Sequence, residues 1–474
     1  MSEQSPAAFR SVSTKWTVTL SILGVAMLVL YRIGVHAKSV PDIAWFLKLV
    51  VVQIVIYFAA AWLSLRTRDS RPLLVLGLIF AALFRLSIIF SAPYLSDDIY
   101  RYVWDGRVQS AGINPYRYVP ADDSLADLRD EKIYPNINRR DYAHTIYPPV
   151  AEGAFLLITR FSESVTWMKA VMVGFEAIAV WVLVQLLTSF GFARQRVLIY
   201  AWHPLAVWEF AGSGHVDALA LAFIALALLA RRKQGETLTG FMLACATCVK
   251  LFPAVLFPTL YMRKSWKMPL AFAATILVAY LPYLNVGPVA TLGFLPGYVS
   301  ERGMINGEQF FLLTVARQLL NAHIPGSAYL IFAVALLGVL SIWLMRDQQS
   351  NLDAAALRCN FNAETLRHRD IADDIQYLRN GLIIATVFMV LLAPHFSWYF
   401  SWLIIFLCFI PSIPVFYLTV ASFVLYLTWI NDTPERVFIL KGIIYVPVFI
   451  TGLIVILWRQ ALNKTRHNAG LHKD

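Results

Sequence analysis

Long runs of hydrophobic residues, each bounded by charged or turn-forming residues, recur along the whole chain. The runs that are long enough to cross roughly 30 Å of hydrocarbon as helices cover about 16–34, 43–64, 72–92, 167–189, 214–230, 268–285, 327–345, 414–430 and 438–458. The first run is longer than the apolar core of a cleavable signal, so we expect it to remain as the first helix. The pattern predicts an all-α fold of membrane-spanning helices.

Three further apolar stretches are interrupted by polar residues or proline. His203 and Pro204 interrupt 197–211, and Pro394 and His395 divide 380–410 into two expected spans joined by a tight turn. The stretch 238–262 breaks near Lys250 and has basic residues at both ends, so the positive-inside rule favours a hairpin of two short helices. Together the runs predict a polytopic transmembrane helical bundle of about 12–14 spans.

Composition supports a multi-pass integral membrane protein and excludes a soluble one. Hydrophobic residues make up 59% of the chain, charged residues 15%, and mean hydropathy is +0.62. A soluble protein usually has about 25% charged residues. The net charge of +11 would suggest nucleic acid in a soluble protein, but here we expect no nucleic-acid partner, because basic residues collect in cytoplasmic loops.

Charge and helix parity together predict the orientation of the chain. With the N-terminus inside, the basic loop 66–71 and the basic tail are cytoplasmic, and 93–149 faces the extracytoplasmic side. This loop is expected to carry interfacial helices at 94–110 and 147–160, since it is too long for a simple connector. The expected regions are 1–92 (N-terminal transmembrane helices), 93–166 (outer loop), 167–345 (transmembrane core), 346–379 (cytoplasmic linker) and 380–474 (C-terminal helices and basic tail).

The densest polar segment follows the third apolar run. Asp97 and Asp98 stand at the expected outer boundary of the membrane, where they could cap a helix, act as a base or bind a cation. On a helix, Asp98 shares one face with Arg101 and Tyr102, and Asp105 and Arg107 extend the group along the chain. Helix capping with a neutralising arginine remains an alternative for this cluster by itself.

Ionisable residues also recur where a spanning helix should have none. They are Glu152, His203, Glu209, His215, Asp217, Lys250 and His395. Such residues usually face a cavity or pair with one another, so we expect a polar cavity that opens outward beneath the acidic loop. Arg101, Arg107 and Lys250 would suit a phosphate, and aromatic residues such as Trp104 would suit a sugar ring.

Five ordered motifs carry a resemblance to a known superfamily. They are DDIYRYVWDGRVQSAGINPY (97–116), YPPVAEGAF (147–155), WHPLAVWEFAGSGHVDALAL (202–221), KLFPAVLFP (250–258) and HFSWYFSW (395–402). In this order the chain resembles the GT-C superfamily of integral-membrane glycosyltransferases, and within it polyprenol-phosphate-mannose-dependent mannosyltransferases and their bacterial relatives. The resemblance implies transfer of a mannose-like hexose, with inversion, from a polyprenyl-phosphate donor to an extracytoplasmic glycan or lipid acceptor. It also implies residence in the bacterial cytoplasmic membrane.

The resemblance also suggests roles for individual residues. The family pattern of an acid followed by Arg at +3 and Tyr at +4 matches Asp98, Arg101 and Tyr102, which makes Asp98 the expected general base and Asp97 its catalytic neighbour. Lys250, Arg101 and Arg107 are expected to bind the donor phosphate. The residues expected to hold the sugar or the acceptor are Tyr102, Trp104, Asp105, Glu152, His203, His215, Asp217 and His395. No cofactor is assigned with certainty; a divalent cation, Mg²⁺ or Mn²⁺, would bind at Asp97 and Asp98.

Two other classes of function remain open from the residues alone. A transporter or flippase of a lipid-linked or anionic substrate would also need a polar cavity, although such proteins often contain matched broken helices in two repeats, and this chain has one clear lysine-centred break. A structural subunit of an envelope assembly is the third reading. It predicts that Asp97, Asp98 and Lys250 can be replaced without effect on a lipid-sugar reaction.

Overall fold

The computed structural model describes residues 6–36, 42–262, 266–358 and 375–470, and their secondary structure is helical throughout. The N-terminal part forms α1 (Pro6–Gly34), α2 (Ile43–Arg66), α3 (Arg71–Ile88), α4 (Asp98–Ser110), η2 (Asp123–Leu128), η3 (Tyr134–Asn136), α5 (Pro149–Thr159) and α6 (Val165–Ser189). The expected all-α fold is confirmed.

The central part contains several short helices in succession. They are η4 (Arg194–Val197), α7 (Leu198–Ala201), α8 (Pro204–Val207), η5 (Trp208–Ser213), α9 (Asp217–Arg232), α10 (Glu236–Thr247), η6 (Phe252–Leu256), α11 (Phe257–Leu260), α12 (Lys267–Tyr280), η7 (Leu281–Val286), η8 (Ala290–Leu292), α13 (Leu295–Glu301) and α14 (Phe311–Leu320). Lys250 therefore lies in the break between α10 and η6, as the hairpin prediction required.

The C-terminal part returns along the bundle. It comprises α15 (Gly326–Arg358), α17 (Gln376–Leu392), η9 (Ser397–Leu403), α18 (Ile404–Leu407), α19 (Ile413–Ala421), η10 (Ser422–Trp429) and α20 (Pro434–Gly470). The predicted turn at Pro394 and His395 separates α17 from η9. Helix α15 continues past the expected boundary at 345, and residues 359–374 of the expected cytoplasmic linker lie outside the described residues.

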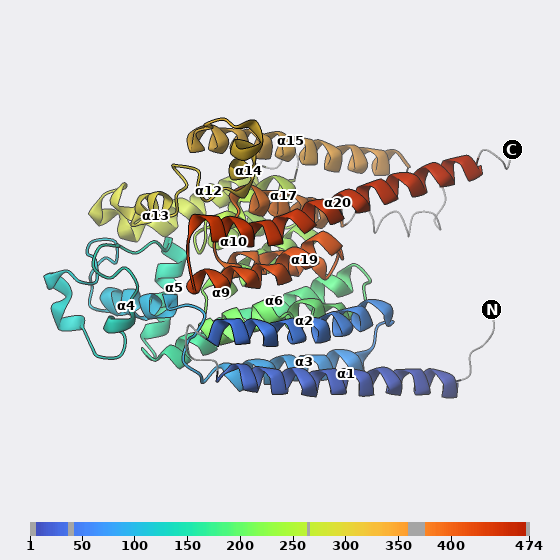
Figure 1. Cartoon of the computed structure of the whole chain (residues 1–474), viewed down its shortest axis with the longest axis horizontal. Coiled ribbons are helices and arrows are strands. Elements are labelled where there is room, and N and C mark those ends of the chain that lie inside the picture. Colours follow the sequence, from blue (N-terminus) through green and yellow to red (C-terminus); the bar gives the residue numbers. More distant parts are fainter. Residues whose placement is uncertain (1–5, 37–41, 263–265, 359–374, 471–474) are drawn as a thin grey trace.

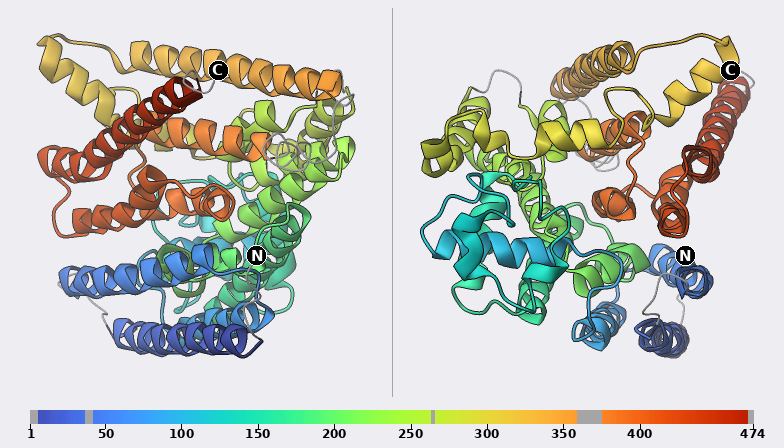
Figure 2. Two further views of the ribbon diagram at one scale, coloured as in Figure 1. Left: turned by 90° about the vertical axis from the view of Figure 1, so that its right-hand side faces the viewer. Right: turned by 60° about the vertical axis from the view of Figure 1, so that its left-hand side comes forward.

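The long helices lie side by side, and the polar outer elements gather at one end of the bundle. In Figure 1, α4, α5 and α13 lie at the left end, whereas the beginning of α1 and the end of α20 lie at the right. The two views in Figure 2 show the N-terminal helices on one flank and α15 and α20 on the other. The outer loop is therefore opposite both chain ends, as helix parity predicted.

Seven helical segments among the described residues are long and apolar enough to cross a membrane. They are Thr14–Gly34, Ile43–Arg66, Arg71–Ile88, Val165–Ser189, Lys267–Val286, Gly326–Arg346 and Pro434–Trp458. Much of their apolar surface faces outward: in the most apolar stretch of Gly326–Arg346 only 17% of residues are buried within the protein. Outward-facing apolar side chains at this density are expected against lipid, so the protein is an integral membrane protein.

The short helices between these spans have local causes. Pro204 cannot continue a helix from the preceding turn, and His203 caps the new helix by accepting a hydrogen bond from the Leu205 N–H. The π-helical turn of η5 ends at Gly214, whose φ of 76° suits glycine. Such breaks expose backbone and side-chain polar groups at membrane depth, which is tolerated where they line a cavity.

Candidate functional site

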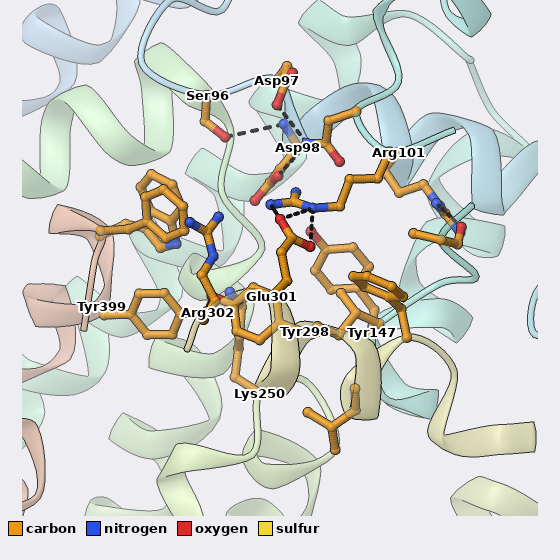
Figure 3. Close-up of a pocket in the computed structure, with 18 of the residues that line it drawn as sticks. Ser96, Asp97, Asp98, Arg101, Tyr147, Lys250, Tyr298, Glu301, Arg302 and Tyr399 are labelled. Atoms are coloured by element: carbon orange, nitrogen blue, oxygen red, sulfur yellow. Dashed lines mark hydrogen bonds and ion pairs between the residues drawn. The ribbon is translucent and has the colours of Figure 1, made fainter. Parts of the chain in front are cut away.

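A cavity of about 840 Å³ lies at the end of the bundle that carries the outer loop. Its walls come from the segment before α4, the loop around Asn138, the break at Lys250, the region of α13 and the aromatic segment of η9. Figure 3 shows Asp97 and Asp98 on one side of this cavity and Lys250, Arg302, Tyr298 and Tyr399 on another. A cavity lined by acidic, basic and aromatic residues is thus present at this end of the bundle.

Asp97 and Asp98 occupy the start of α4, on the cavity wall. One amide bridges them: Asn138 Nδ2 donates to Asp97 Oδ1 at 2.6 Å and to Asp98 Oδ1 at 3.0 Å. The Asp98 N–H in turn donates to Ser96 Oγ at 3.2 Å. The partial positive charge of a helix N-terminus also favours carboxylates here, and the guanidinium of Arg139 adds positive charge near both acids.

The two acids differ in their surroundings. Although solvent in the cavity reaches Asp97, the surrounding protein removes much of its hydration, and this raises the pKa of Asp97 above its usual value. The neighbouring Asp98 carboxylate adds to the shift, and the Asn138 hydrogen bond opposes it. The side chain of Asp98 is 23% exposed. It is therefore accessible from the cavity and also has contacts behind it.

The outer loop is held against the α13 region. Arg139 makes a bidentate ion pair with Glu301, in which Nη2 and Oε1 lie 2.8 Å apart. The Phe294 N–H also donates to the Thr145 carbonyl at 3.0 Å. These contacts join segments that are about 150 residues apart in the sequence, and they close one side of the cavity.

Lys250 supplies a positive charge on the opposite wall. Its Nζ lies 3.2 Å from Asp217 Oδ2 and 5.1 Å from the centroid of the Tyr399 ring. Asp217 is buried, whereas Lys250 borders the cavity. Lys250 was expected to bind the donor phosphate and Asp217 the sugar or acceptor, and the structure pairs the two: Asp217 neutralises Lys250 from below, and Lys250 borders the cavity.

Arg302 is a second cation on this wall, and the sequence analysis did not single it out. Its guanidinium lies over the Phe396 ring, 4.5 Å from the centroid, and 5.5 Å from the Tyr298 centroid. No carboxylate lies within ion-pair distance of Arg302 in the part of the chain that the structure describes. The guanidinium is held by aromatic rings and keeps its hydrogen-bond donors for a ligand.

Behind Asp98 lies a buried group that contains His215 and Glu209. His215 Nδ1 is 3.9 Å from Asp98 Oδ2, and His215 Nε2 is 3.3 Å from Glu209 Oε2. The other oxygen of Glu209 accepts a hydrogen bond from the Tyr426 hydroxyl. The side chains of His215 and Glu209 are fully buried, and neither residue lines the cavity.

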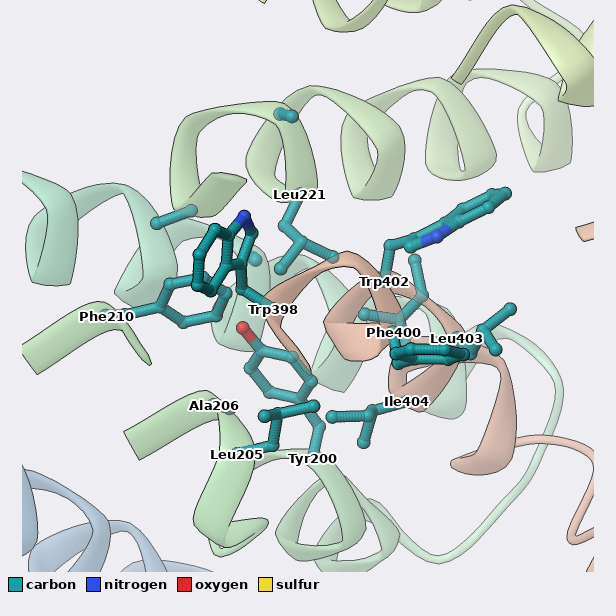
Figure 4. Packing of buried hydrophobic residues seen from close by; sticks show 14 of the residues in the cluster. Tyr200, Leu205, Ala206, Phe210, Leu221, Trp398, Phe400, Trp402, Leu403 and Ile404 are labelled. Atoms are coloured by element: carbon teal, nitrogen blue, oxygen red, sulfur yellow. The ribbon is translucent and has the colours of Figure 1, made fainter. Parts of the chain in front are cut away.

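The His215 ring is supported by a dense aromatic core. It stacks on Trp398 with the centroids 4.2 Å apart and the planes at 26°. Figure 4 shows Trp398 packed among Phe210, Tyr200 and Leu221, which come from the broken helices before α9 and from α9 itself. The apolar residues of motif 202–221 thus hold the polar residues of the same motif, such as His215, in position.

Arg101 and Asp105 lie on the inner face of α4 and bind one another. Arg101 Nε donates to Asp105 Oδ1 at 2.8 Å, and Nη1 donates to the Ala143 carbonyl at 3.0 Å. Arg101 still contributes to the cavity wall. Tyr102, also on α4, is buried and stacks on Phe155 at 4.6 Å. Its position is that of a packing residue beneath the acidic pair.

Two expected site residues lie away from the cavity, and their assignments are corrected. Arg107 forms ion pairs with Asp130 and Glu163 at 2.9 and 2.8 Å on the outer surface of α4. It follows Asp98 by nine residues, which at about 100° per residue places it on the opposite face of the helix. His203 caps α8, and its Nε2 lies 3.1 Å from Thr419 Oγ1.

Three more expected sugar or acceptor ligands do not border the cavity. Trp104 is buried against the Tyr134 ring at 5.6 Å. Glu152 accepts hydrogen bonds from Thr145 Oγ1 at 2.6 Å and Gln109 Nε2 at 2.8 Å. His395 Nε2 lies 3.3 Å from Asp432 Oδ1. Each of these three side chains therefore contacts another residue of the protein and does not line the cavity.

The residues that complete the site lie in the loop around Asn138, in the short helix α13 and directly after it. Asn138, Arg139, Tyr298, Glu301 and Arg302 come from segments 138–139 and 298–302. Segment 138–139 was expected on the outer side, but neither segment has a motif that marks a ligand. The sequence showed only that Arg139, Glu301 and Arg302 are charged residues outside the long apolar runs.

The acidic pair is chemically suited to a divalent cation that also binds a substrate phosphate. Mg²⁺ usually keeps several waters and uses one or two carboxylates, and Asp97 and Asp98 both face the cavity. Among the described residues, no three His, Cys, Asp or Glu side chains are grouped as a metal site. Such a cation would supply neutralisation of phosphate charge beside these two carboxylates.

Comparison with known proteins gives one family match. A model of the MptA_B family, described as an alpha-(1->6)-mannopyranosyltransferase N-terminal domain, matches residues 12–264. The chain belongs to this family. Searches among curated proteins and among solved structures return no match. Membership confirms the resemblance to mannosyltransferases and supports a mannosyltransferase activity, with a sugar donor and an acceptor as substrates.

The family match covers one wall of the cavity and leaves part of the other outside it. Asp98, His215 and Lys250 lie within 12–264, whereas Tyr298 and Arg302 lie beyond it. The mannosyltransferase domain thus supplies the acidic pair and the lysine. The later segments add the arginine and most of the aromatic residues that face them.

Proposed function

We propose that this protein transfers a mannosyl group from a polyprenyl-phosphate donor to a hydroxyl group of a glycan or lipid acceptor. The observation that carries the proposal is a single cavity with Asp97 and Asp98 on one wall and Lys250 and Arg302 on another. A glycosyl transfer from a phosphate donor needs these two groups at once: a base for the acceptor hydroxyl and cations for the departing phosphate.

The donor phosphate would bind between Lys250 and Arg302. Arginine offers paired donors to phosphate oxygens, and lysine adds a point charge. The adjoining wall is apolar and suits a prenyl chain; its residues include Leu251, Phe252, Phe388, Leu392 and Trp429. The combination of two cations and an apolar wall supports a lipid phosphate over a soluble sugar nucleotide.

Asp98 would act as the general base. Its carboxylate is accessible from the cavity, is oriented by Asn138, and carries no ion pair with an arginine or a lysine among the described residues. The proton of the acceptor hydroxyl passes to Asp98 while the hydroxyl oxygen forms a bond to the anomeric carbon. The electrons of the broken carbon–oxygen bond leave with the polyprenyl phosphate. A single displacement of this kind inverts the anomeric centre and needs no covalent nucleophile.

Asp97 and the tyrosines would assist without exchanging the proton. The raised pKa of Asp97 favours its protonated form relative to an ordinary aspartate, which would let it donate a hydrogen bond to the acceptor. The hydroxyl groups of Tyr298 and Tyr399 lie 3.3 Å apart, and their rings offer faces to a sugar. With Asp97 ionised instead, Asp97 and Asp98 are the residues that would hold Mg²⁺ or Mn²⁺, which would supply positive charge for the phosphate.

The reaction would take place on the extracytoplasmic side of a bacterial cytoplasmic membrane. The cavity end of the bundle is opposite both chain ends. The basic clusters Arg66–Arg71 and Arg231–Lys233 flank the other ends of α2 and α9, and positive loops stay in the cytoplasm. The linkage in the family's description favours a primary hydroxyl at position 6 of the acceptor sugar.

A donor panel tests this proposal. The purified full-length protein in lipid nanodiscs would be given labelled mannose either on a short-chain polyprenyl phosphate or on GDP, with octyl α-mannoside as acceptor. We expect a dimannoside only from the lipid donor, and its linkage would be read by mass and NMR. Transfer from GDP-mannose alone, or no glycosidic product from either donor, would contradict the proposal. Parallel reactions with a chelator test the cation.

A further inference from the structure

A second, smaller cavity lies beside the main one and has no role in the transfer described so far. Its volume is about 330 Å³, which is at the lower end of the range of roughly 300–1,000 Å³ that is usual for small-molecule sites. His144 lines both cavities, so the two adjoin at this residue. The residues that line the smaller cavity are Tyr116, Arg117, His144, Val286, Ala290 and Gly293.

The smaller cavity adjoins the main one on the side of the proposed base. His144 belongs to the outer loop, which also supplies Asp98 and Asn138 to the main cavity. Lys250 and Arg302, which would bind the donor phosphate, come from other segments. A ligand that reaches from the main cavity past His144 is therefore expected to be the acceptor and not the donor lipid.

Backbone contacts join the two walls of the smaller cavity. The Phe294 N–H donates a hydrogen bond to the Thr145 carbonyl at 3.0 Å. At Gly293, where φ is 53°, a Cβ atom would collide with the same carbonyl oxygen, so this close approach requires glycine. The segments that carry His144 and Gly293 are thus held together, and the smaller cavity is formed without a ligand.

Arg117 gives this cavity a hydrogen-bonding group that the fold does not use. Arg117 is exposed, and its guanidinium makes no ion pair, hydrogen bond or ring contact with the residues that the structure describes. Guanidinium N–H groups can donate to the hydroxyl groups of a sugar. Val286 and Ala290 add small apolar surfaces for the C–H groups of a sugar ring, and no acidic side chain lines the cavity.

We propose that the smaller cavity binds the second sugar of an oligosaccharide acceptor, while the terminal sugar presents its hydroxyl group to Asp98. This inference rests on the proposed function, in which the main cavity transfers mannose to a glycan. Arg117 donates hydrogen bonds to hydroxyl groups of the second sugar, and Val286 and Ala290 contact its ring. The smaller cavity thereby makes an acceptor of two sugars a better substrate than an acceptor of one.

The main test compares octyl α-mannoside with octyl 6-O-α-mannosyl-α-mannoside as acceptors in the transfer assay. Hydrogen bonds from a charged group should give the disaccharide a kcat/KM at least about tenfold higher with the wild-type protein. Arg117→Gln should remove most of this preference, and Ala290→Trp should remove it by filling the cavity. Transfer to octyl α-mannoside should stay near the wild-type rate in both variants, because this acceptor does not reach the smaller cavity.

The matched control is Arg160→Gln. Arg160 is another exposed arginine of the outer loop, has no ion pair among the described residues, and lines neither cavity. This variant should keep the preference for the disaccharide. Equal kcat/KM for the two acceptors in the wild-type protein would overturn the inference, as would a preference that survives undiminished in Arg117→Gln or in Ala290→Trp.

Binding of the disaccharide without a donor gives a reading that does not depend on transfer. In saturation-transfer NMR, both sugars should contact the wild-type protein, whereas only the terminal sugar should contact Ala290→Trp. No contact of the second sugar with the wild-type protein would refute the smaller cavity as its site. If both sugars bind but neither acceptor receives mannose, the proposed function fails. If both acceptors receive mannose with equal kcat/KM, only the inference about the smaller cavity fails.

Discussion

The ion pair between Lys250 and Asp217 gives a prediction that separates folding from phosphate binding. The two charged atoms are 3.2 Å apart, and the side chains of Lys250 and Asp217 are 12% and 1% exposed. At an effective dielectric constant of about 20, two unit charges at this distance attract by about 5 kcal/mol. Lys250→Met removes this attraction and leaves the carboxylate buried without a partner.

The expected cost of the single substitution is about 3–5 kcal/mol, as for other buried pairs that lose one member. For domains of 150–250 residues, each kcal/mol of lost stability lowers the melting temperature by at least about 2 °C. The melting temperature of Lys250→Met should therefore fall by about 6–10 °C. The double variant Lys250→Met, Asp217→Asn has no unpaired charge, so it should melt within about 2 °C of the wild-type protein.

The protein carries its own reporters for this melting experiment. Cys245, Cys248 and Cys408 are buried and free, so a thiol-reactive dye in detergent will label them as the helices separate. In the transfer assay, both variants should lose about 10²-fold in kcat/KM for the donor, since one cation of the phosphate site is gone. Wild-type melting of the single variant would refute the energetic argument. Recovery of transfer in the double variant would refute the phosphate role of Lys250.

Three further predictions use residues around the same cavity. Burial, with Asp105 nearby, raises the pKa of Glu152 well above its usual value; the folded protein therefore loses stability as pH rises above about 4.5. Glu152→Gln should match the wild-type melting temperature near pH 4.5 and exceed it increasingly at higher pH, and the opposite trend would contradict the argument. Arg302→Gln should raise KM for the donor by about 10- to 100-fold. Arg107→Gln should leave this KM unchanged and lower the melting temperature by only a few degrees. Equal effects of the two substitutions on KM would contradict the placement of Arg302, and not Arg107, in the donor cavity. Asn138→Ala should lower kcat by about tenfold by releasing both aspartates, and unchanged kcat would show that the bridging amide is dispensable.

Hydrophobic patterning was sufficient to predict the helical bundle and several of its breaks. Apolar runs of spanning length leave few alternatives to transmembrane helices, and the breaks at Lys250 and Pro394 are visible as a charge or a proline inside such a run. The outer helices α4 and α5 lie within the predicted segments 94–110 and 147–160. These features depend on local sequence, which explains why they could be predicted.

The composition of the cavity depends on contacts that local sequence does not record. Asn138 bridges Asp97 and Asp98 from 40 residues away, and Arg302 joins Lys250 on the cavity wall from the end of α13. A histidine in an apolar segment can stabilise the fold or belong to the site, and the sequence does not distinguish the two roles. His203 caps a helix, whereas His215 lies beside the proposed base. Only the packing of the helices distinguishes them.

Helix geometry could have removed one wrong assignment in advance. Arg107 was grouped with Asp98 because the two belong to one motif, but nine residues of helix turn its side chain to the far face. There it pairs with Asp130 and Glu163. Applying the helical period within α4 selects Arg101 and Tyr102 as neighbours of Asp98 and excludes Arg107.

The rate of mannosyl transfer by Asp98→Asn tests the central claim most directly. Asparagine keeps the shape of the side chain and its contact with Asn138, but it cannot accept the proton of the acceptor hydroxyl. With the polyprenyl-phosphate donor and octyl α-mannoside, we predict that kcat falls by at least about 10³-fold, while the melting temperature and the affinity for donor remain near wild type. A variant that is folded and still transfers mannose at the wild-type rate would contradict the assignment of this cavity as the catalytic site with Asp98 as its base.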